Sequence, residues 1–173
     1  MKYNLILVLI LTVLFKGNAQ ELKIGDKAPD IIQKSVNGEV LQLSSLRGQM
    51  VLIDFWASWC KPCRKENKHL VKTYQKFRNK GFKDGEGFTI FSVSLDNNSK
   101  SWKQAIEKDS LIWTDHVSDL QGWRNKAAKR YLIRSIPQTY LIDGNGIIVA
   151  KNLRGLALER HLKSQRKKTF FFF

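Results

Sequence analysis

The sequence of 173 residues predicts a single α/β domain, in which helices flank a mixed central sheet and a β-hairpin precedes it. Three observations support this prediction. The apolar run MVLIDFWA at residues 50–57 is typical of a strand buried on both faces. Strand-like and helix-like segments alternate after it, which favours a partly parallel sheet. The length suffices for one hydrophobic core and is short for two.

The first twenty residues have the layout of a secretory signal peptide. Lys2 precedes an apolar run at 5–15, and Gly17 and Ala19 supply small residues for a cleavage site. The run is shorter than the ~17 to 25 residues that a membrane-spanning helix needs. We therefore assign residues 1–19 to a signal peptide, with an uncleaved membrane anchor as the alternative, and expect an exported, periplasmic protein.

The N-terminal half continues with a hairpin, a turn, the buried strand and a helix. Residues 31–43 contain two short strands around the turn dipeptide Asn37-Gly38. Residues 44–49 form a short helical turn or loop. Residues 61–80 predict an amphipathic helix that ends near a glycine. Four of its apolar residues recur at helical spacing and are expected to pack inward: Leu70, Val71, Tyr74 and Phe77.

Further along, strands and helices alternate. The segment FKDGEG at 82–87 predicts a polar loop, and FTIFSVSL at 88–95 a second core strand. A helix follows over 99–110, with Ser99 as its N-cap. We expect a short strand over 111–119 and another helix over 120–133.

The C-terminal part predicts two more strands and a last helix. Residues 138–152 contain strands joined by the turn DGNG. The helix that begins at residue 155 is amphipathic, and three leucines are expected to pack inward: Leu156, Leu158 and Leu162. We assign residues 20–168 to one domain and leave the Phe-rich tail, 169–173, unassigned.

The composition is strongly basic, with 30 Lys and Arg against 15 Asp and Glu and a formal net charge of +15. Such a charge suits nucleic acid or an anionic membrane surface. We favour solvated helix surfaces, because most of these lysines fall at outward helix positions and an exported protein does not meet nucleic acid. We predict no nucleic-acid partner, and membrane contact only if the signal stays uncleaved.

Both cysteines, Cys60 and Cys63, lie in the segment FWASWCKPCRKE after the buried strand. A structural zinc site normally takes four Cys or His ligands, and none of the three histidines stands at ligand spacing, so we predict no metal. As a structural staple the pair would close a very short loop and restrict the unfolded chain little. A redox-active disulfide uses both cysteines and fits an oxidising compartment.

The predicted helix gives the two sulfurs different roles. Cys60 lies at the helix N-terminus, where unpaired N–H groups and the helix dipole favour an anion. Such placement lowers a thiol pKa from about 8.5 towards ~3.5 to 7.5. We therefore assign Cys60 as the attacking thiolate and Cys63, one turn further along, as the resolving thiol. Pro62 fits the first helical turn, because it lacks an N–H and stiffens the ring.

Two acidic residues are candidates for proton transfer. Asp54 is the one polar residue in the buried strand, and a buried carboxyl with a raised pKa can exchange a proton with Cys63. An edge or bulge position is its alternative interpretation. Glu66 follows Cys63 by one helical turn and shares its face. Its alternative is a solvated first-turn acid favoured by the helix dipole.

The segment LIDFWASWCKPCRKE resembles the active site of the thioredoxin superfamily, and is most similar to the exported TlpA/ResA-type thiol-disulfide oxidoreductases. The resemblance spans about residues 22–163 and includes IGDKAPD, LSSLRGQ, FSVSLD, YLIRSIPQTYLID and DGNG in order. It implies a thioredoxin-like fold and no cofactor. Asp54 and Glu66 match acids of the family's active site, although many TlpA-type proteins carry Asn at the first position. Departures are the FKDGEG insertion, the basic last helix and the FFFF end.

The resemblance also implies roles around the cysteine pair. Pro137 corresponds to the family's cis-proline, which lies beside the cysteines and keeps metal away from them. The Ser135-Ile136 backbone is expected to pair with the client chain. Together with Trp59 and Pro62, these residues form the predicted substrate-binding set.

We therefore predict a monomeric thiol-disulfide oxidoreductase that reduces disulfides in exported client proteins and is re-reduced by a membrane electron donor. The resemblance suggests apocytochrome c thiols as one client class. A disulfide oxidase with the same centre is an alternative, because direction depends on reduction potential. A peroxiredoxin-like peroxidase shares the APD segment, but its cysteine follows Pro and Thr or Ser. A Cu(I) chaperone is the third alternative, because soft thiolates suit that ion.

Overall fold

The computed structural model describes residues 21–167, so the predicted signal peptide and the tail at 169–173 lie outside the described residues. Seven strands form one mixed sheet in the order β2-β1-β7-β6-β3-β8-β9. Their bounds are β1 Ile32–Ser35, β2 Val40–Gln42, β3 Met50–Trp56, β6 Phe88–Ser94, β7 His116–Ser118, β8 Gln138–Ile142 and β9 Ile148–Lys151. The predicted α/β class, mixed sheet and N-terminal hairpin are confirmed.

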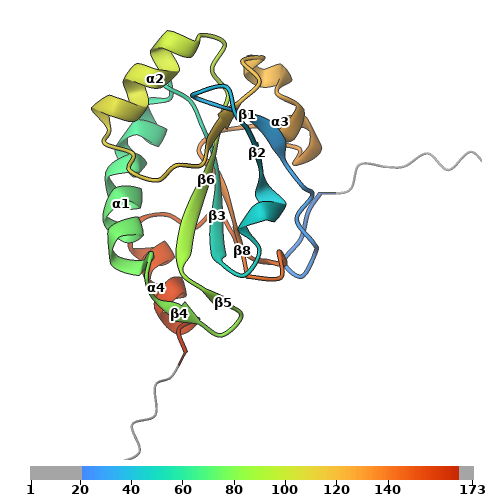
Figure 1. Cartoon of the computed structure of the whole chain (residues 1–173), viewed down its shortest axis with the longest axis vertical. Coiled ribbons are helices and arrows are strands. Elements are labelled where there is room, and N and C mark those ends of the chain that lie inside the picture. The colour runs from blue at the N-terminus through green and yellow to red at the C-terminus, as the bar shows by residue number, and fades with distance from the viewer. Residues whose placement is uncertain (1–20, 168–173) are drawn as a thin grey trace, which may run out of the picture.

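The helices are α1 Lys61–Phe77, α2 Ser99–Lys108, α3 Lys126–Arg130 and α4 Gly155–Ser164, with short 3-10 helices at Leu43–Leu46 and Gly122–Arg124. Helices α1, α2 and α4 cover one side of the sheet, and α3 lies on the other (Figure 1). Within residues 21–167, no helix combines the length and the apolar character needed to cross a membrane.

Strand β3 is the centre of the sheet. It pairs in parallel with β6 and antiparallel with β8, and all seven of its residues are buried. Asp54 therefore lies inside the core, and its alternative interpretation as an edge or bulge position is wrong. The carboxyl ends of β3 and β6 meet at one edge of the sheet, where α/β proteins place their binding sites.

Helix α1 packs on this sheet through a stripe that only partly follows the apolar pattern. Leu70 and Phe77 are buried, as predicted, whereas Val71 and Tyr74 are only partly covered. Cys63, Asn67 and Thr73 complete the buried stripe. The polar members were not predicted, because apolar spacing carries no information about a polar side chain that finds a buried partner.

The segment predicted as a polar loop at 82–87 is instead part of a small hairpin, formed by β4 Gly81–Phe82 and β5 Gly85–Glu86. Phe82 is fully buried, with its ring centroid 6.5 Å from that of Phe77. Asp84 O accepts a hydrogen bond from Gly144 N at 2.6 Å. A Cβ atom at Gly144 would lie 2.2 Å from that oxygen, so this contact requires glycine.

The hairpin also binds the end of the last helix. Lys83 N donates to Gln165 O at 2.9 Å, and Phe82 forms an isolated bridge with Arg166. On its other side, Glu86 N donates to Gly48 O at 2.6 Å, next to the start of β3. The insertion therefore fastens α4 to the beginning of the central strand.

Two predicted helices differ from the structure at their N-terminal ends. Asn98, not Ser99, caps α2, because its side chain accepts a hydrogen bond from Ser101 N. The helix predicted over 120–133 shrinks to α3, because the buried Asn125 side chain caps a new helix start there by accepting two backbone N–H bonds.

The predicted inward face of α4 is partly wrong. Leu158 and Leu162 are fully buried. Leu156 is 71% exposed, because it lies in the first turn, on the side that faces away from the sheet.

Candidate active site

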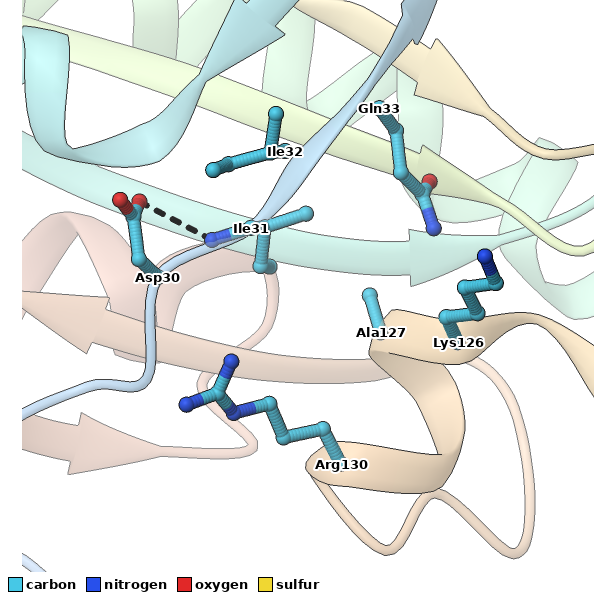
Figure 2. Close-up of a pocket in the computed structure, with 7 residues that line it drawn as sticks. All are labelled: Asp30, Ile31, Ile32, Gln33, Lys126, Ala127 and Arg130. Atoms are coloured by element: carbon cyan, nitrogen blue, oxygen red, sulfur yellow. Dashed lines mark hydrogen bonds between the residues drawn. The ribbon is translucent and has the colours of Figure 1, made fainter.

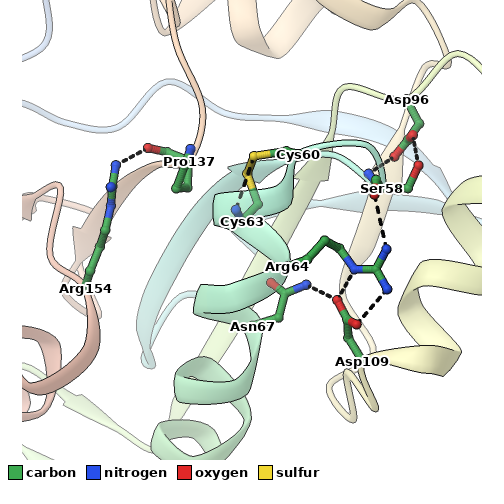
Figure 3. Close-up of a disulfide and its surroundings, with 9 residues drawn as sticks. All are labelled: Ser58, Cys60, Cys63, Arg64, Asn67, Asp96, Asp109, Pro137 and Arg154. Carbon is green, nitrogen blue, oxygen red and sulfur yellow. Dashed lines mark hydrogen bonds and ion pairs between the residues drawn. A yellow bond between two sulfur atoms is a disulfide. The ribbon is translucent and has the colours of Figure 1, made fainter.

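Cys60 and Cys63 form a disulfide with a Cα–Cα distance of 5.3 Å (Figure 3). Cys60 is the N-cap residue of α1, and its Sγ accepts a hydrogen bond from Cys63 N at 3.2 Å. Pro62 stands in the first helical turn, as predicted. Cys60 is 5% exposed and Cys63 only 1%. The geometry therefore places Cys60 Sγ, the more exposed of the two sulfur atoms, where a helix N-terminus stabilises a thiolate.

The loop before β8 faces this disulfide. The Ile136–Pro137 peptide is cis, as the family resemblance predicted. Pro137 is buried and lies opposite the sulfur atoms in Figure 3. Ser135 is exposed and Ile136 partly exposed. The structure thus brings the predicted Ser135-Ile136 backbone to the surface beside the cysteine pair.

The other two predicted substrate-binding residues lie on the cysteine side of the site. Trp59, directly before Cys60, is 52% exposed. Pro62 is also exposed. All five residues of the predicted substrate-binding set therefore flank the disulfide or belong to the loop that faces it.

Asp54 is 3% exposed, and no described group donates a hydrogen bond to its carboxylate. Burial raises the pKa of Asp54 to about 7, and the nearby charge of Glu66 adds to the increase, whereas Arg154 opposes it. A carboxyl with this pKa exchanges protons readily at neutral pH. Proton transfer between Asp54 and Cys63 stays a prediction.

The first residues of α4 link two parts of the site. Glu66 Oε1 accepts a hydrogen bond from Gly155 N at 2.6 Å, so this carboxylate caps a backbone N–H of α4. The neighbouring Arg154 donates through Nη2 to Pro137 O (Figure 3). One turn of chain therefore holds both the cysteine-bearing helix and the proline loop. The sequence did not predict the contact between Glu66 and Gly155, because 89 residues separate them.

A second carboxylate, which the sequence analysis did not single out, fixes the loop before Cys60. Asp96 follows β6 and is 2% exposed. Its carboxylate accepts hydrogen bonds from Ser58 N at 2.9 Å, Ser58 Oγ at 2.5 Å and Ser94 Oγ at 2.7 Å. The position of Asp96 could have been inferred from the sequence, because this residue follows the second predicted core strand. The carboxyl ends of neighbouring parallel strands meet at one edge of the sheet, which places Asp96 near the residues that follow β3.

Arg64 supports the same loop from α1. It forms an ion pair with Asp109 at the end of α2, and its Nη1 donates to Ser58 O at 3.1 Å (Figure 3). Asn67 Nδ2 also donates to Asp109, at 2.7 Å. The hydrogen bond to Asp109 explains why Asn67, a polar residue, lies in the buried stripe of α1.

A separate cavity of about 230 Å³ lies between β1 and α3 (Figure 2). Asp30, Lys126 and Arg130 contribute its charged groups, and neither cysteine lines it. Among residues 21–167, no group of three or more His, Cys, Asp or Glu side chains is placed to hold a metal ion.

Comparison with known proteins agrees with this site. A model of the AhpC/TSA family matches residues 24–151. The chain belongs to the AhpC/TSA family. The thiol-disulfide oxidoreductase ResA of Oceanobacillus iheyensis is 31% identical over 173 residues, covering 91% of this chain and 82% of that protein. A ResA protein of Bacillus cereus is 27% identical over 137 residues, covering 79% and 73% respectively.

Solved structures show the same kinship. The thioredoxin domain of a thiol-disulfide oxidoreductase from Bacteroides vulgatus is 36% identical, with a TM-score of 0.76, covering 85% of this chain and 100% of that one. A thiol:disulfide interchange protein from a Bacteroides species is 37% identical, with a TM-score of 0.73, covering 83% and 90%. The thioredoxin-like fold, the ResA-type resemblance and the enzyme class, a thiol-disulfide oxidoreductase, are confirmed.

Proposed function

We propose that this AhpC/TSA-family oxidoreductase acts as an exported, monomeric reductase of disulfides in client proteins. The observation that carries the proposal is the placement of the Cys60–Cys63 disulfide at the start of α1, opposite Pro137. The signal-like pattern of residues 1–19 supports export. Apocytochrome c is one client class, and a membrane protein with a dithiol is the electron donor that the cycle requires.

In the first step, the Cys60 thiolate attacks a sulfur of the client disulfide. A bond forms between Cys60 Sγ and that sulfur, and the other client sulfur leaves as a thiolate that takes a proton from water. Backbone N–H groups at the start of α1 stabilise the attacking thiolate. The Ser135-Ile136 backbone holds the client segment in place.

In the second step, Cys63 resolves the mixed disulfide. Its thiol gives a proton to the Asp54 carboxylate, and the resulting thiolate attacks Cys60 Sγ. The second client sulfur leaves as a thiolate and takes the proton back from Asp54, which restores the carboxylate. The client has then gained two electrons from Cys60 and Cys63 and two protons, one from water and one through Asp54, and the Cys60 proton was released to water when its thiolate formed. The donor dithiol reverses both steps on the protein to restore its thiols.

A trapping experiment tests this function. We expect Cys63→Ser to accumulate mixed disulfides between Cys60 and client proteins in the native host, because the resolving thiol is missing. Non-reducing electrophoresis and mass spectrometry identify them, with Cys60→Ser as the control that captures none. A Cys63→Ser variant that captures no client would contradict the mechanism. Cell fractionation of the same strain tests export.

Measurement of the reduction potential separates the reductase from an oxidase. We expect a value well below roughly −200 mV, because proteins that work as oxidants lie above that range. A more positive potential would favour the oxidase.

A peroxidase is the second candidate, because the family match over residues 24–151 includes the APD segment at 28–30 that peroxiredoxin-like proteins share. The residues before Cys60 are Ala57, Ser58 and Trp59, without the Pro and Thr or Ser pattern of that branch. We therefore expect negligible peroxide turnover by the reduced protein.

A further inference from the structure

An open groove is lined by Trp59, the residue directly before Cys60. It has a volume of about 510 Å³, and its walls include Trp59 and Trp123. The two rings lie 6.1 Å apart between centroids and are tilted by 50°. Both are large apolar side chains about half exposed, at 52% and 49%. Exposed aromatic pairs of this kind are typical of binding surfaces.

Apart from Trp59, the groove is formed by segments outside the cysteine motif. Trp123 belongs to the 3-10 helix Gly122–Arg124, between β7 and α3, and Leu95 lines the groove after β6. Trp59 directly precedes Cys60 in the sequence. A chain that lies across both indole rings is therefore close to the sulfur that attacks it.

The rim of the groove is positively charged. Arg124 lines it and also borders a neighbouring cavity that contains Lys126 and Lys129. These three side chains are exposed, and none belongs to an ion pair with another described residue. The neighbouring cavity is also lined by Asp119, whose carboxylate accepts hydrogen bonds from Gln121 N, Lys126 N and the Asn125 amide, so three basic side chains stand there against one acidic one.

We propose that this aromatic-basic groove, defined as Trp59, Trp123, Arg124, Lys126 and Lys129, binds client segments that carry a large apolar side chain and acidic residues beside their disulfide. The proposal rests on the proposed function and names the substrate class of the same site. A second copy of the chain fits poorly, because it carries the same charge of +15. Single-stranded nucleic acid also suits aromatic and basic groups, but the adjacent disulfide favours a protein client.

Three synthetic peptides with the same intramolecular disulfide test the proposal. One carries Phe with two Glu, the second Ala with two Glu, and the third Phe with two Lys. The rate of oxidation of the reduced protein by each peptide is measured by quenching, alkylation and mass spectrometry. Each rate is divided by the rate of that peptide with dithiothreitol, which corrects for intrinsic reactivity.

We expect the Phe–Glu peptide to react about tenfold faster than the Phe–Lys peptide at low salt, because opposite charges speed association. It should react about fivefold faster than the Ala–Glu peptide, because an apolar anchor fills the groove. The charge preference should shrink at 0.5 M salt, where the screening length falls to about 4 Å.

Variants locate the preference within the groove. Trp123→Ala should bring the ratio of the Phe–Glu to the Ala–Glu rate close to one. The triple variant Arg124→Gln, Lys126→Gln, Lys129→Gln should bring the ratio of the Phe–Glu to the Phe–Lys rate close to one. The matched control Lys72→Gln, Lys80→Gln, Lys163→Gln removes the same charge from exposed positions on or next to α1 and on α4 and should keep both ratios.

Several outcomes would overturn the proposal. Equal corrected rates for the three peptides, with the uncharged hydroxyethyl disulfide still reduced, would reject the groove and leave the proposed function intact. If the control triple variant also lost the charge preference, the preference would come from the net charge of the protein and not from the groove. If the three peptides react at equal rates and a dT oligonucleotide slows all three reactions to the same extent, the groove would be assigned to nucleic acid instead. Failure to reduce any disulfide would reject the proposed function itself.

Discussion

Two buried aspartates beside the cysteine pair have opposite surroundings. Asp54 lies in β3 and Asp96 follows β6, its parallel neighbour, and they are 3% and 2% exposed. Asp96 accepts three hydrogen bonds from Ser58 and Ser94. Asp54 accepts none from a described group, and burial raises its pKa to about 7.

The difference shows that burial alone does not decide what a carboxylate does. Hydrogen-bond donors compensate the buried charge of Asp96, which is therefore suited to fix the geometry of the loop before Cys60. Without donors, the charged form of Asp54 is costly, so this residue holds its proton until near-neutral pH. One aspartate is a structural support, and the other is suited to proton transfer.

The largest expected effect is that of Asp96→Ala. The substitution leaves the buried donors of Ser58 and Ser94 without their acceptor, so we expect a loss of about 3 kcal/mol in the free energy of unfolding. Urea unfolding of the oxidised protein, followed by circular dichroism, measures it. Asp96→Asn keeps one acceptor oxygen and should cost less. If Asp96→Ala destabilises no more than Asp54→Ala does, the two aspartates do not differ in the way described.

Asp54→Asn should have a smaller effect that depends on pH and has the opposite sign. The native carboxyl keeps its proton until about pH 7, whereas in the unfolded chain it ionises near the ordinary value of 3.8. The unfolded state therefore binds fewer protons between these values, and wild-type stability falls as pH rises through them. The shift from 3.8 to about 7 corresponds to an upper limit of roughly 4 kcal/mol. The variant should match wild type near pH 4 and exceed it by about 2 kcal/mol at pH 8, because relaxation and water penetration reduce the cost of a buried charge.

Comparison at each pH isolates this contribution. Burial lowers the pKa of His116 to about 4, which makes both proteins lose stability as pH falls from about 6.5 to 4. Since the histidine is common to wild type and Asp54→Asn, it cancels in their difference. A stability difference that does not change between pH 4 and 8 would show that Asp54 does not titrate as described.

The smallest expected effect concerns Arg154. Its charge lowers the pKa of Asp54, against the effects of burial and Glu66. Arg154→Gln should raise the pKa of Asp54 further, by less than about one unit, because the guanidinium is exposed and screened by water. The ¹³C chemical shift of the Asp54 carboxyl measures this, with Arg154→Lys as the control that keeps the charge. A lower pKa of Asp54 in Arg154→Gln than in wild type would contradict the effect assigned to the Arg154 charge.

The sequence predicts those features that depend on short-range patterns. An apolar strand followed by a helix places Cys60, Pro62 and Cys63 correctly, because a strand, a turn and a helix N-terminus are all local. Asp54 stands out because it interrupts an otherwise apolar strand. The cis peptide at Pro137 required the family resemblance, since most X-Pro bonds are trans.

Contacts between distant segments were not predictable in this way. Asp96 reaches Ser58 over 38 residues and Arg64 reaches Asp109 over 45. Such pairs follow from the order of strands in the sheet rather than from spacing along the chain. Phe82 was missed for a related reason: an aromatic residue in a polar segment packs only because Phe77 and the end of α4 lie beside it.

The β4–β5 hairpin also matters for protein engineering. It holds the end of α4 near the start of β3, whereas Cys60 follows the other end of that strand (Figure 1). A fluorescent protein or affinity tag fused after α4 would therefore leave the fold on the side remote from the client. The same tag inserted at Gly122–Arg124 would obstruct the groove, so the attachment point decides whether a labelled protein can still be used to follow exchange.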